Sequence, residues 1–242
     1  MGNKKREGIL SGSILSIPFY KIPEKIKIAK EHGLKLIHVD IMDGVFVPQL
    51  SFGLNFARQL REITDLDLEA HLMIIDPEKL ITQIPDKLFN RVFFHYEATL
   101  YPLRLINNIK NKGAEAGVAI NPSTPIQHIE PILSEIDAVL VMLVEPGYGG
   151  QKMIPFMTRK IEQLRVIREE QGYDFIIACD GGVKIDNAET LIKKGADELI
   201  VGTGLFDSPR FPEVISEFLS LLKKTSNSPH NALKNSLSSE YQ

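Results

Sequence analysis

The stretch "LIHVDIMDG", residues 36–44, decides the fold because it joins an apolar strand to polar side chains near its end. Its β-branched and apolar residues are typical of a strand buried in a parallel sheet. His38 and Asp40 lie two positions apart, and a strand points such residues to the same face. In a barrel that face is the interior. Ligands of α/β folds bind at the carboxyl ends of the strands, so this pair marks a candidate site.

Similar apolar runs recur on both sides of this stretch and alternate with segments whose apolar residues follow a helical spacing. The eight runs predicted as strands are residues 8–17, 36–41, 66–73, 91–95, 116–120, 138–144, 175–179 and 198–201. Predicted helices include residues 23–32, 101–112, 156–171, 186–194 and 212–224. This alternation indicates βαβ units, and it is compatible with a closed barrel or an open doubly wound sheet. The polar strand ends favour an α/β fold of the (βα)8 TIM barrel type.

Four helix-length segments end in the same way, with a cationic residue in the last turn and a glycine just before the next strand. These glycines are Gly33, Gly113, Gly172 and Gly195. Each is predicted to adopt the left-handed conformation that ends a helix, where Lys or Arg also favours the negative end of the helix dipole. The regular pattern covers residues 1–224, which we expect to form a single domain. The Ser- and Asn-rich residues 225–242 lose the pattern, and we expect a flexible tail there.

The composition argues against a polyanionic partner. The 242 residues contain 28 Lys and Arg against 31 Asp and Glu, a formal charge of −3, so no basic field would hold nucleic acid or an anionic membrane. Cys179 is the only cysteine and cannot form an intramolecular disulfide. The N-terminal residues lack the apolar core of a signal peptide. We therefore expect a cytoplasmic protein with a small-molecule ligand.

Four polar residues at predicted strand ends suggest a metal site: His38, Asp40, His71 and Asp180. Burying an ionised carboxylate and an imidazole inside a barrel is costly unless they share a partner, and a divalent cation is the simplest one. Two imidazoles and two carboxylates suit zinc, iron(II), manganese or cobalt better than calcium or magnesium. A single histidine of this kind is more often a core residue bonded to a carboxylate. The set of four favours the metal.

Glycine-rich turns follow the last three predicted strands, at residues 145–150, 180–182 and 201–204. Barrel phosphate sites lie after strands seven and eight, where glycine lets backbone amides approach an anion closely. The amides of Gly182, Gly202 and Thr203 are therefore predicted to bind a phosphate group.

Taken together, these segments resemble the ribulose-phosphate 3-epimerase family over residues 9–222. The matching stretches are "SILS" (13–16), "IHVDIMDG" (37–44), "FVP" (46–48), "HLM" (71–73), "FHYEAT" (94–99), "NPSTP" (121–125), "VLVMLVEPGYGGQ" (139–151), "DGGV" (180–183) and "VGT" (201–203). The resemblance implies a homo-oligomeric isomerase, a dimer or a hexamer. Its expected reaction is the metal-dependent conversion of D-ribulose 5-phosphate to D-xylulose 5-phosphate.

The resemblance also implies roles for individual residues. His38, Asp40, His71 and Asp180 would bind the metal, and Asp40 and Asp180 would also be the acid and base that invert C3 through a cis-enediolate. The residues expected to contact the substrate are Ser13, His71, Met42, Met73 and Met142, together with the phosphate-facing amides of Gly149, Gly150, Gly182, Gly202 and Thr203.

The chain departs from the family pattern at Glu69 and Ala178, where "DVHLM" and "EVDGG" are usual. Each lies two residues before a predicted ligand and should point inward below it. We expect the longer Glu69 to fill the space that Ala178 leaves and to keep one carboxylate beside the ligands. Val45, Gln49 and Leu143 are further departures that affect the rim of the pocket. His95 and Glu97 match the family but have no derived role.

Three other interpretations remain open at this level. The substrate could be a six-carbon ketose phosphate such as allulose 6-phosphate, because nothing in the sequence measures the carbon count. The chain could be a catalytically silent barrel that binds a sugar phosphate. A metal-dependent decarboxylase or hydrolase is a third interpretation, although it lacks the extra Lys or Glu that such chemistry requires beside the ligands.

Overall fold

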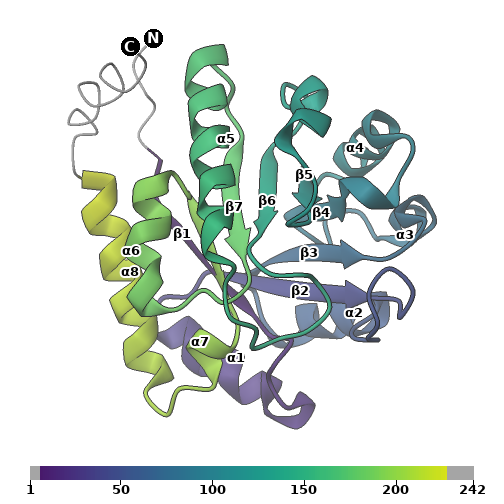
Figure 1. The fold of residues 1–242 in the computed structure, drawn as a ribbon. Helices are drawn as coiled ribbons and strands as arrows, with labels where there is room; N and C mark the ends of the chain where they lie inside the picture. Colours follow the sequence, from purple (N-terminus) through teal and green to yellow (C-terminus); the bar gives the residue numbers. More distant parts are fainter. Residues whose placement is uncertain (1–5, 228–242) are drawn as a thin grey trace, which may run out of the picture.

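Eight parallel strands close into a barrel in chain order, with β8 pairing back to β1, in the computed structural model, which describes residues 6–227 (Figure 1). The strands are β1 (Ile9–Ser13), β2 (Leu36–Met42), β3 (Asp67–Met73), β4 (Arg91–His95), β5 (Glu115–Ile120), β6 (Ala138–Met142), β7 (Ile176–Asp180) and β8 (Glu198–Val201). The predicted closed barrel is therefore confirmed, and the open sheet is excluded.

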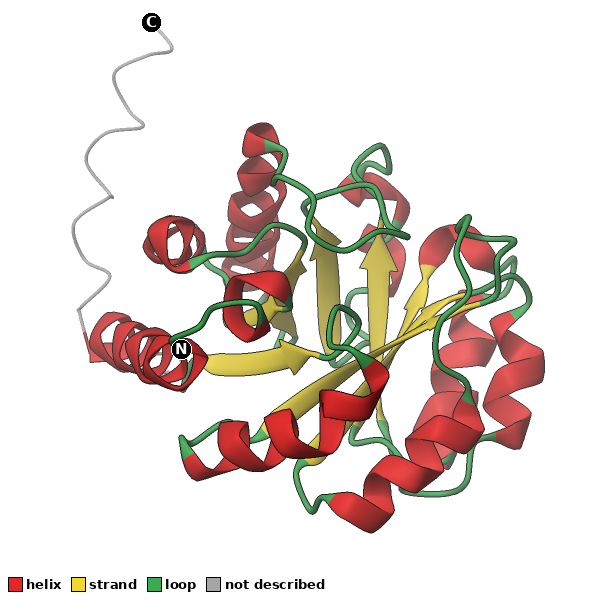
Figure 2. Cartoon of the chain, turned by 90° about the horizontal axis from the view of Figure 1, so that it is seen from below, coloured by secondary structure: helices red, strands yellow, loops and turns green. Residues whose placement is uncertain are grey.

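Helices surround the strands on the outside, as Figure 2 shows in the view from below. They are α1 (Ile22–Glu31), α2 (Leu54–Ile63), α3 (Pro77–Gln83), α4 (Pro102–Asn111), α5 (Thr158–Gln171), α6 (Ile185–Lys194), α7 (Thr203–Phe206) and α8 (Phe211–Asn227). Between β5 and β6 the chain forms two short 3-10 turns, η3 (Ile126–His128) and η4 (Glu130–Ile132), in place of an α-helix. Among residues 6–227, no helix combines the length and the apolar character that crossing a lipid bilayer requires.

Two strand predictions are wrong at their carboxyl ends, and the causes are local. The run at residues 8–17 leaves the barrel after Ser13, because Ile17 turns back to donate its backbone N–H to Ile14. The run at residues 138–144 ends at Met142. Apolar residues continue past both ends because the loops that cover the barrel are also buried. The length of an apolar run alone therefore overestimates the length of the strand.

The predicted glycine stops are confirmed. Gly33, Gly113, Gly172 and Gly195 all have positive φ, at 93°, 77°, 68° and 118°. Helix α8 continues to Asn227, beyond the expected boundary at residue 224. The rest of the predicted tail, residues 228–242, lies outside the described residues.

The barrel interior has an apolar side and a polar side. Phe93, Leu140, Ala178 and Ile200 belong to one buried apolar cluster inside the strands. On the other side, β1 to β4 and β8 point buried polar groups inward. These residues are Ser11, Ser13, His38, Asp40, Glu69, His71, Arg91, His95 and Glu198. The division leaves the polar half as the place where chemistry can occur.

Gly117 makes room for the largest interior side chain on the apolar side. A Cβ at this position would lie 2.2 Å from Cδ1 of the fully buried Phe93 ring, far inside contact distance. Because β4 and β5 are paired with Phe93 directly opposite Gly117, the ring could not move away from an added methyl group without disturbing the strands.

The substitution Gly117→Ala is expected to lower the free energy of unfolding by about 1–3 kcal/mol, because overpacking forces the ring and the strands apart. Chemical denaturation followed by circular dichroism measures the change. Gly149→Ala is the control, since an added Cβ there meets nothing within 4 Å. Equal stability of the two variants would contradict the packing account.

Candidate active site

Four side chains meet at the carboxyl ends of β2, β3 and β7. His38, Asp40, His71 and Asp180 each offer one ligand atom, and these atoms lie within 4.8 Å of one another. His38 and Asp40 point inward together because they alternate along β2, and His71 is the register partner of Asp40 on β3. Asp180 is the last residue of β7, on another part of the barrel wall. The structure thus brings the predicted set together, while its role as a ligand set stays a prediction.

The ring of His38 is held in one orientation by a carboxylate on the neighbouring strand, β3. Its Nδ1 lies 2.8 Å from Oε1 of Glu69, so Nδ1 carries the proton that Glu69 accepts. The other nitrogen, Nε2, is buried, has no hydrogen-bond partner among the described residues and lies 3.4 Å from Oδ1 of Asp40. Burial would lower the pKa of His38, but the charges of Asp40 and Glu69 raise it well above its ordinary value, so a cation bound at the centre of the cluster would replace a proton on Nε2.

Glu69 lies inside the barrel and is bonded to a predicted ligand, as expected from the sequence. Besides His38 it accepts a hydrogen bond from the Ser11 hydroxyl at 2.7 Å and pairs with Arg91 at 3.3 Å. Burial by itself would raise the pKa of Glu69, but the hydrogen bond and charge of His38 and the charge of Arg91 lower it to about 2. A fixed negative charge on β3 thus supports His38 from the neighbouring strand.

The sequence missed Glu198, which is the register partner of Ala178 on β8 and is fully buried. Its carboxylate pairs with Arg91, which therefore lies between Glu198 and Glu69. The space left by the small side chain of Ala178 therefore lies next to the carboxylate of Glu198. Glu69 alone does not fill this space. Strand alternation could have found Glu198, because it lies two residues before the inward-facing Ile200.

The two aspartates of the cluster have different electrostatic environments. Burial raises the pKa of Asp180 to about 6, and the charge of Asp40 adds to the increase. Burial would also raise the pKa of Asp40, but the positive charge of a protonated His38 beside it holds the pKa well below its ordinary value. One carboxyl group therefore keeps a proton more readily than the other, a difference that suits an acid and a base.

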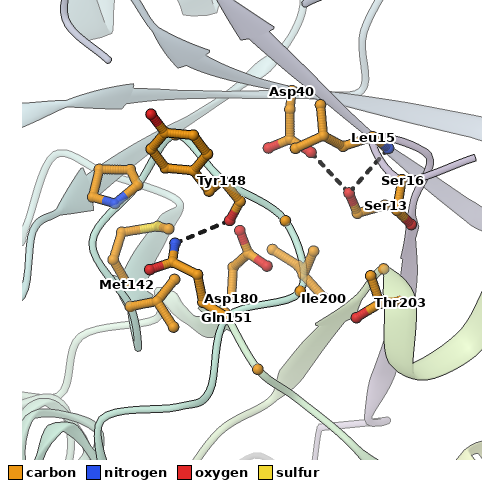
Figure 3. A pocket seen from close by; sticks show the side chains of 18 of the residues that line it. Ser13, Leu15, Ser16, Asp40, Met142, Tyr148, Gln151, Asp180, Ile200 and Thr203 are labelled. Atoms are coloured by element: carbon orange, nitrogen blue, oxygen red, sulfur yellow. Dashed lines mark hydrogen bonds between the residues drawn. The ribbon is translucent and has the colours of Figure 1, made fainter. Parts of the chain in front are cut away.

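A pocket with about 580 Å³ of empty space, partly open to solvent, lies above these residues at the mouth of the barrel (Figure 3). Asp40 and Asp180 line it from β2 and β7, and the Ser13 hydroxyl donates a 2.8 Å hydrogen bond to Asp40. The predicted substrate-contacting residues on its wall are Ser13, Met42, Met73, Met142, Gly149, Gly150, Gly182, Gly202 and Thr203.

His71 is the one residue of the predicted substrate-contacting set that does not line this pocket. It is fully buried, and its ring nitrogens face Asp40 and His95. Conversely, the pocket wall includes Leu15, Ser16, Tyr148 and Gln151, to which the sequence assigned no role. Tyr148 and Gln151 flank the glycines at 149–150, so the glycine-rich turn contained a signal for both.

His95 and Glu97 also belong to this end of the barrel. His95 is the last residue of β4 and is fully buried, and burial lowers its pKa to about 4. Glu97 lies in the following 3-10 turn, η2 (Tyr96–Ala98). Burial would raise the pKa of Glu97, but hydrogen bonds from His95, Thr124 and the backbone of Asn121 lower it to about 2.

Barrels of this kind carry out their chemistry at the carboxyl ends of the strands, and titratable groups in a pocket there are what catalysis requires. The fold and the site therefore define a (βα)8-barrel enzyme.

Comparisons with known proteins identify the family. Residues 9–206 match the family model described as the ribulose-phosphate 3 epimerase family. Ribulose-phosphate 3-epimerase of Methanocaldococcus jannaschii is 43% identical over 81% of this chain and 83% of its own length. The chloroplastic ribulose-5-phosphate-3-epimerase of Arabidopsis thaliana is 41% identical over 87% of this chain and 76% of its own length. The chain belongs to the ribulose-phosphate 3-epimerase family and is accordingly an isomerase.

A solved structure shares the fold at much lower identity. The 3-hexulose-6-phosphate synthase of Salmonella typhimurium superposes with a TM-score of 0.70 at 15% identity, covering 90% of this chain and 99% of its own. At that identity the likeness supports the barrel and says nothing about the reaction.

The substitution Glu69→Gln is expected to weaken binding of a divalent cation by about 10–100-fold, because it removes the charged partner that orients His38. Competition with a chromophoric chelator measures the affinity. Glu115→Gln is the matched control, since Glu115 also pairs with Arg91 but is half-exposed and forms no bond to His38. An equal loss in both variants would show that the Arg91 ion pairs, and not the contact with His38, control the site.

Proposed function

We propose that the protein inverts C3 of D-ribulose 5-phosphate to give D-xylulose 5-phosphate, with Asp40 and Asp180 as the acid and base. The observation that carries the proposal is the convergence of these two carboxyl groups, with His38 and His71, at the base of a pocket in a chain of this family. Inverting C3 requires a proton to leave one face of the carbon and another to arrive at the opposite face. Two carboxyl groups from different strands are the minimal equipment for that task.

The side chains of the cluster fit a divalent cation. His38 Nε2 is a buried nitrogen without a partner among the described residues, and His71 directs Nδ1 to Oδ1 of Asp40 at 3.1 Å. With Asp180 they form a donor set of two imidazoles and two carboxylates, which suits zinc, iron(II), manganese or cobalt. A bound cation would supply Lewis-acid stabilisation of the negative charge that develops on the substrate oxygens.

The protein's own residues position the proton transfers. Ser13 donates to Oδ2 of Asp40, which leaves Oδ1 facing the histidines and fixes the plane of the carboxylate. Asp180 approaches from β7, so the two groups can act on opposite faces of a ketose bound between them. Removal of the C3 proton gives a cis-enediolate, and return of a proton from the other side completes the inversion.

The pocket wall separates an apolar part from a phosphate-binding part. Met42, Met73 and Met142 line the region beside the aspartates, where thioethers offer an apolar surface that adapts to a flat intermediate. The wall also contains glycines 149, 150, 182 and 202 with Thr203. Gly182 has a φ of 67°, and a Cβ there would lie 2.4 Å from the backbone nitrogen of Met153. Only glycine fits, and its amide with those of Gly202 and Thr203 would bind the phosphate.

Exchange of the C3 proton with solvent deuterium on ribulose 5-phosphate tests the reaction, with allulose 6-phosphate as the comparison substrate. We expect faster exchange on the five-carbon substrate, loss of exchange after the divalent ion is removed with a chelator, and recovery when zinc or iron(II) is added. NMR of the C3 proton measures the rate. Undiminished exchange in metal-free protein would contradict the role of the cation.

The substitution Asp180→Asn is expected to reduce C3 exchange by at least about 100-fold, since a general acid–base group typically contributes that much. Circular dichroism verifies that the variant is folded. Asp186→Asn is the control, because this carboxylate is exposed at the start of α6 and does not line the pocket. Persistence of rapid exchange in Asp180→Asn would refute the acid–base assignment.

A further inference from the structure

We propose that His95 and Glu97 are positioning residues that fix the ring of His71 with its Nδ1 lone pair toward Asp40. The proposal rests on the cation site described above, because the lone pair matters only if a cation accepts it. His95 and Glu97 touch neither the pocket nor Asp180, so they act through His71 alone.

The first contact is between two imidazole rings. Nε2 of His95 lies 2.9 Å from Nε2 of His71, and the ring centroids are 5.0 Å apart. At that distance one nitrogen must donate a proton and the other must accept it. The ring of Phe46 packs on His95 with its centroid at 4.7 Å, so His95 cannot turn away.

The second contact decides which nitrogen donates. Nδ1 of His95 lies 3.3 Å from Oε2 of Glu97. An ionised carboxylate only accepts hydrogen bonds, so this nitrogen of His95 carries its proton. A neutral imidazole has a single N–H, which leaves Nε2 of His95 as an acceptor. His71 must then donate from its own Nε2.

The position of this proton determines the state of the other ring nitrogen of His71, Nδ1. With the proton at Nε2, Nδ1 of a neutral His71 holds a lone pair that faces Oδ1 of Asp40 at 3.1 Å. Three close contacts join Asp40, His71, His95 and Glu97, but two neutral imidazoles supply protons for only two of them. The contact without a proton is the one at Asp40, where a cation between the two acceptors would complete the chain.

Glu97 is itself fixed by the loop after β5. Its Oε1 accepts hydrogen bonds from the backbone N–H of Asn121, at 2.8 Å, and from the Thr124 hydroxyl. Lys160 of α5 donates to the carbonyl oxygens of both Asn121 and Thr124. The orientation of His71 therefore depends on a chain of contacts that extends from the barrel interior to the outer helices.

The two histidines of the cluster are thus supported in different ways. His38 contacts the carboxylate of Glu69 directly, whereas His71 reaches the carboxylate of Glu97 through a second imidazole. In both cases a carboxylate selects the nitrogen that bears the proton and leaves the other free for a cation.

Nitrogen NMR of the unmodified, zinc-loaded protein tests the tautomers directly. Long-range proton–nitrogen correlation distinguishes an imidazole protonated at Nδ1 from one protonated at Nε2. We expect His95 to be neutral with its proton on Nδ1, and His71 to carry its proton on Nε2. A proton on Nε2 of His95, or an imidazolium at that position, would overturn the proposal.

Two variants at position 95 separate positioning from space filling. In His95→Phe the ring is replaced without an acceptor, and we expect zinc affinity to fall by about 10–100-fold. In His95→Gln the side-chain amide oxygen can accept the His71 proton, and the affinity should recover most of that loss. Chelator competition measures both, and thermal unfolding shows that both are folded. Equal losses in the two variants would refute the proposal.

The outcomes also separate this inference from the proposed function. The expected tautomers in a protein that fails to exchange the C3 proton would leave the positioning role intact and refute the epimerisation. Rapid exchange of the C3 proton together with the opposite tautomer at His95 would support the epimerisation and refute the positioning role.

Discussion

The structure depends on how buried charge is balanced inside a closed barrel. A carboxylate removed from water is costly unless a cation or hydrogen-bond donors meet it. Glu69 meets that requirement through Arg91, Ser11 and His38, whereas burial raises the pKa of Glu198 well above its ordinary value although Arg91 pairs with it. One layer higher, Asp40 and Asp180 lie near imidazoles, and no Arg or Lys of residues 6–227 pairs with either carboxyl group. The lower layer of the barrel thus contains a fixed cationic side chain, Arg91, and the upper layer has none among residues 6–227.

The division of the interior into two sides makes this balance possible. Bulky apolar residues fill one side of the interior, where Leu140 of β6 and Phe93 of β4 exclude water and Gly117 of β5 makes room for the ring. With that side packed, the polar groups of β1 to β4 are held by rigid strands instead of loops. A constellation built on strands keeps its geometry better than one built on loops.

The same strands explain the order within the polar side. Each strand contributes residues two apart to successive layers, and register places a partner such as Glu69 directly across from the group it supports, His38, on the neighbouring strand. His38 and His71 are supported by different carboxylates, and both end with one nitrogen facing Asp40. Asp40 is therefore the point at which Ser13 and both histidines meet.

The sequence by itself determined the repeated strand–helix pattern, the glycine helix stops and the strand ends that carry polar residues, because these depend on short-range periodicity and backbone preference. It therefore identified the barrel and the four clustered side chains. It missed the role of Glu198, the pairing of His71 with His95 and the wall formed by Tyr148 and Gln151. Those contacts join residues on different strands or loops, and only the register of the closed barrel brings them together. Local periodicity tells which face a side chain occupies, whereas closure of the sheet decides which side chain it meets there.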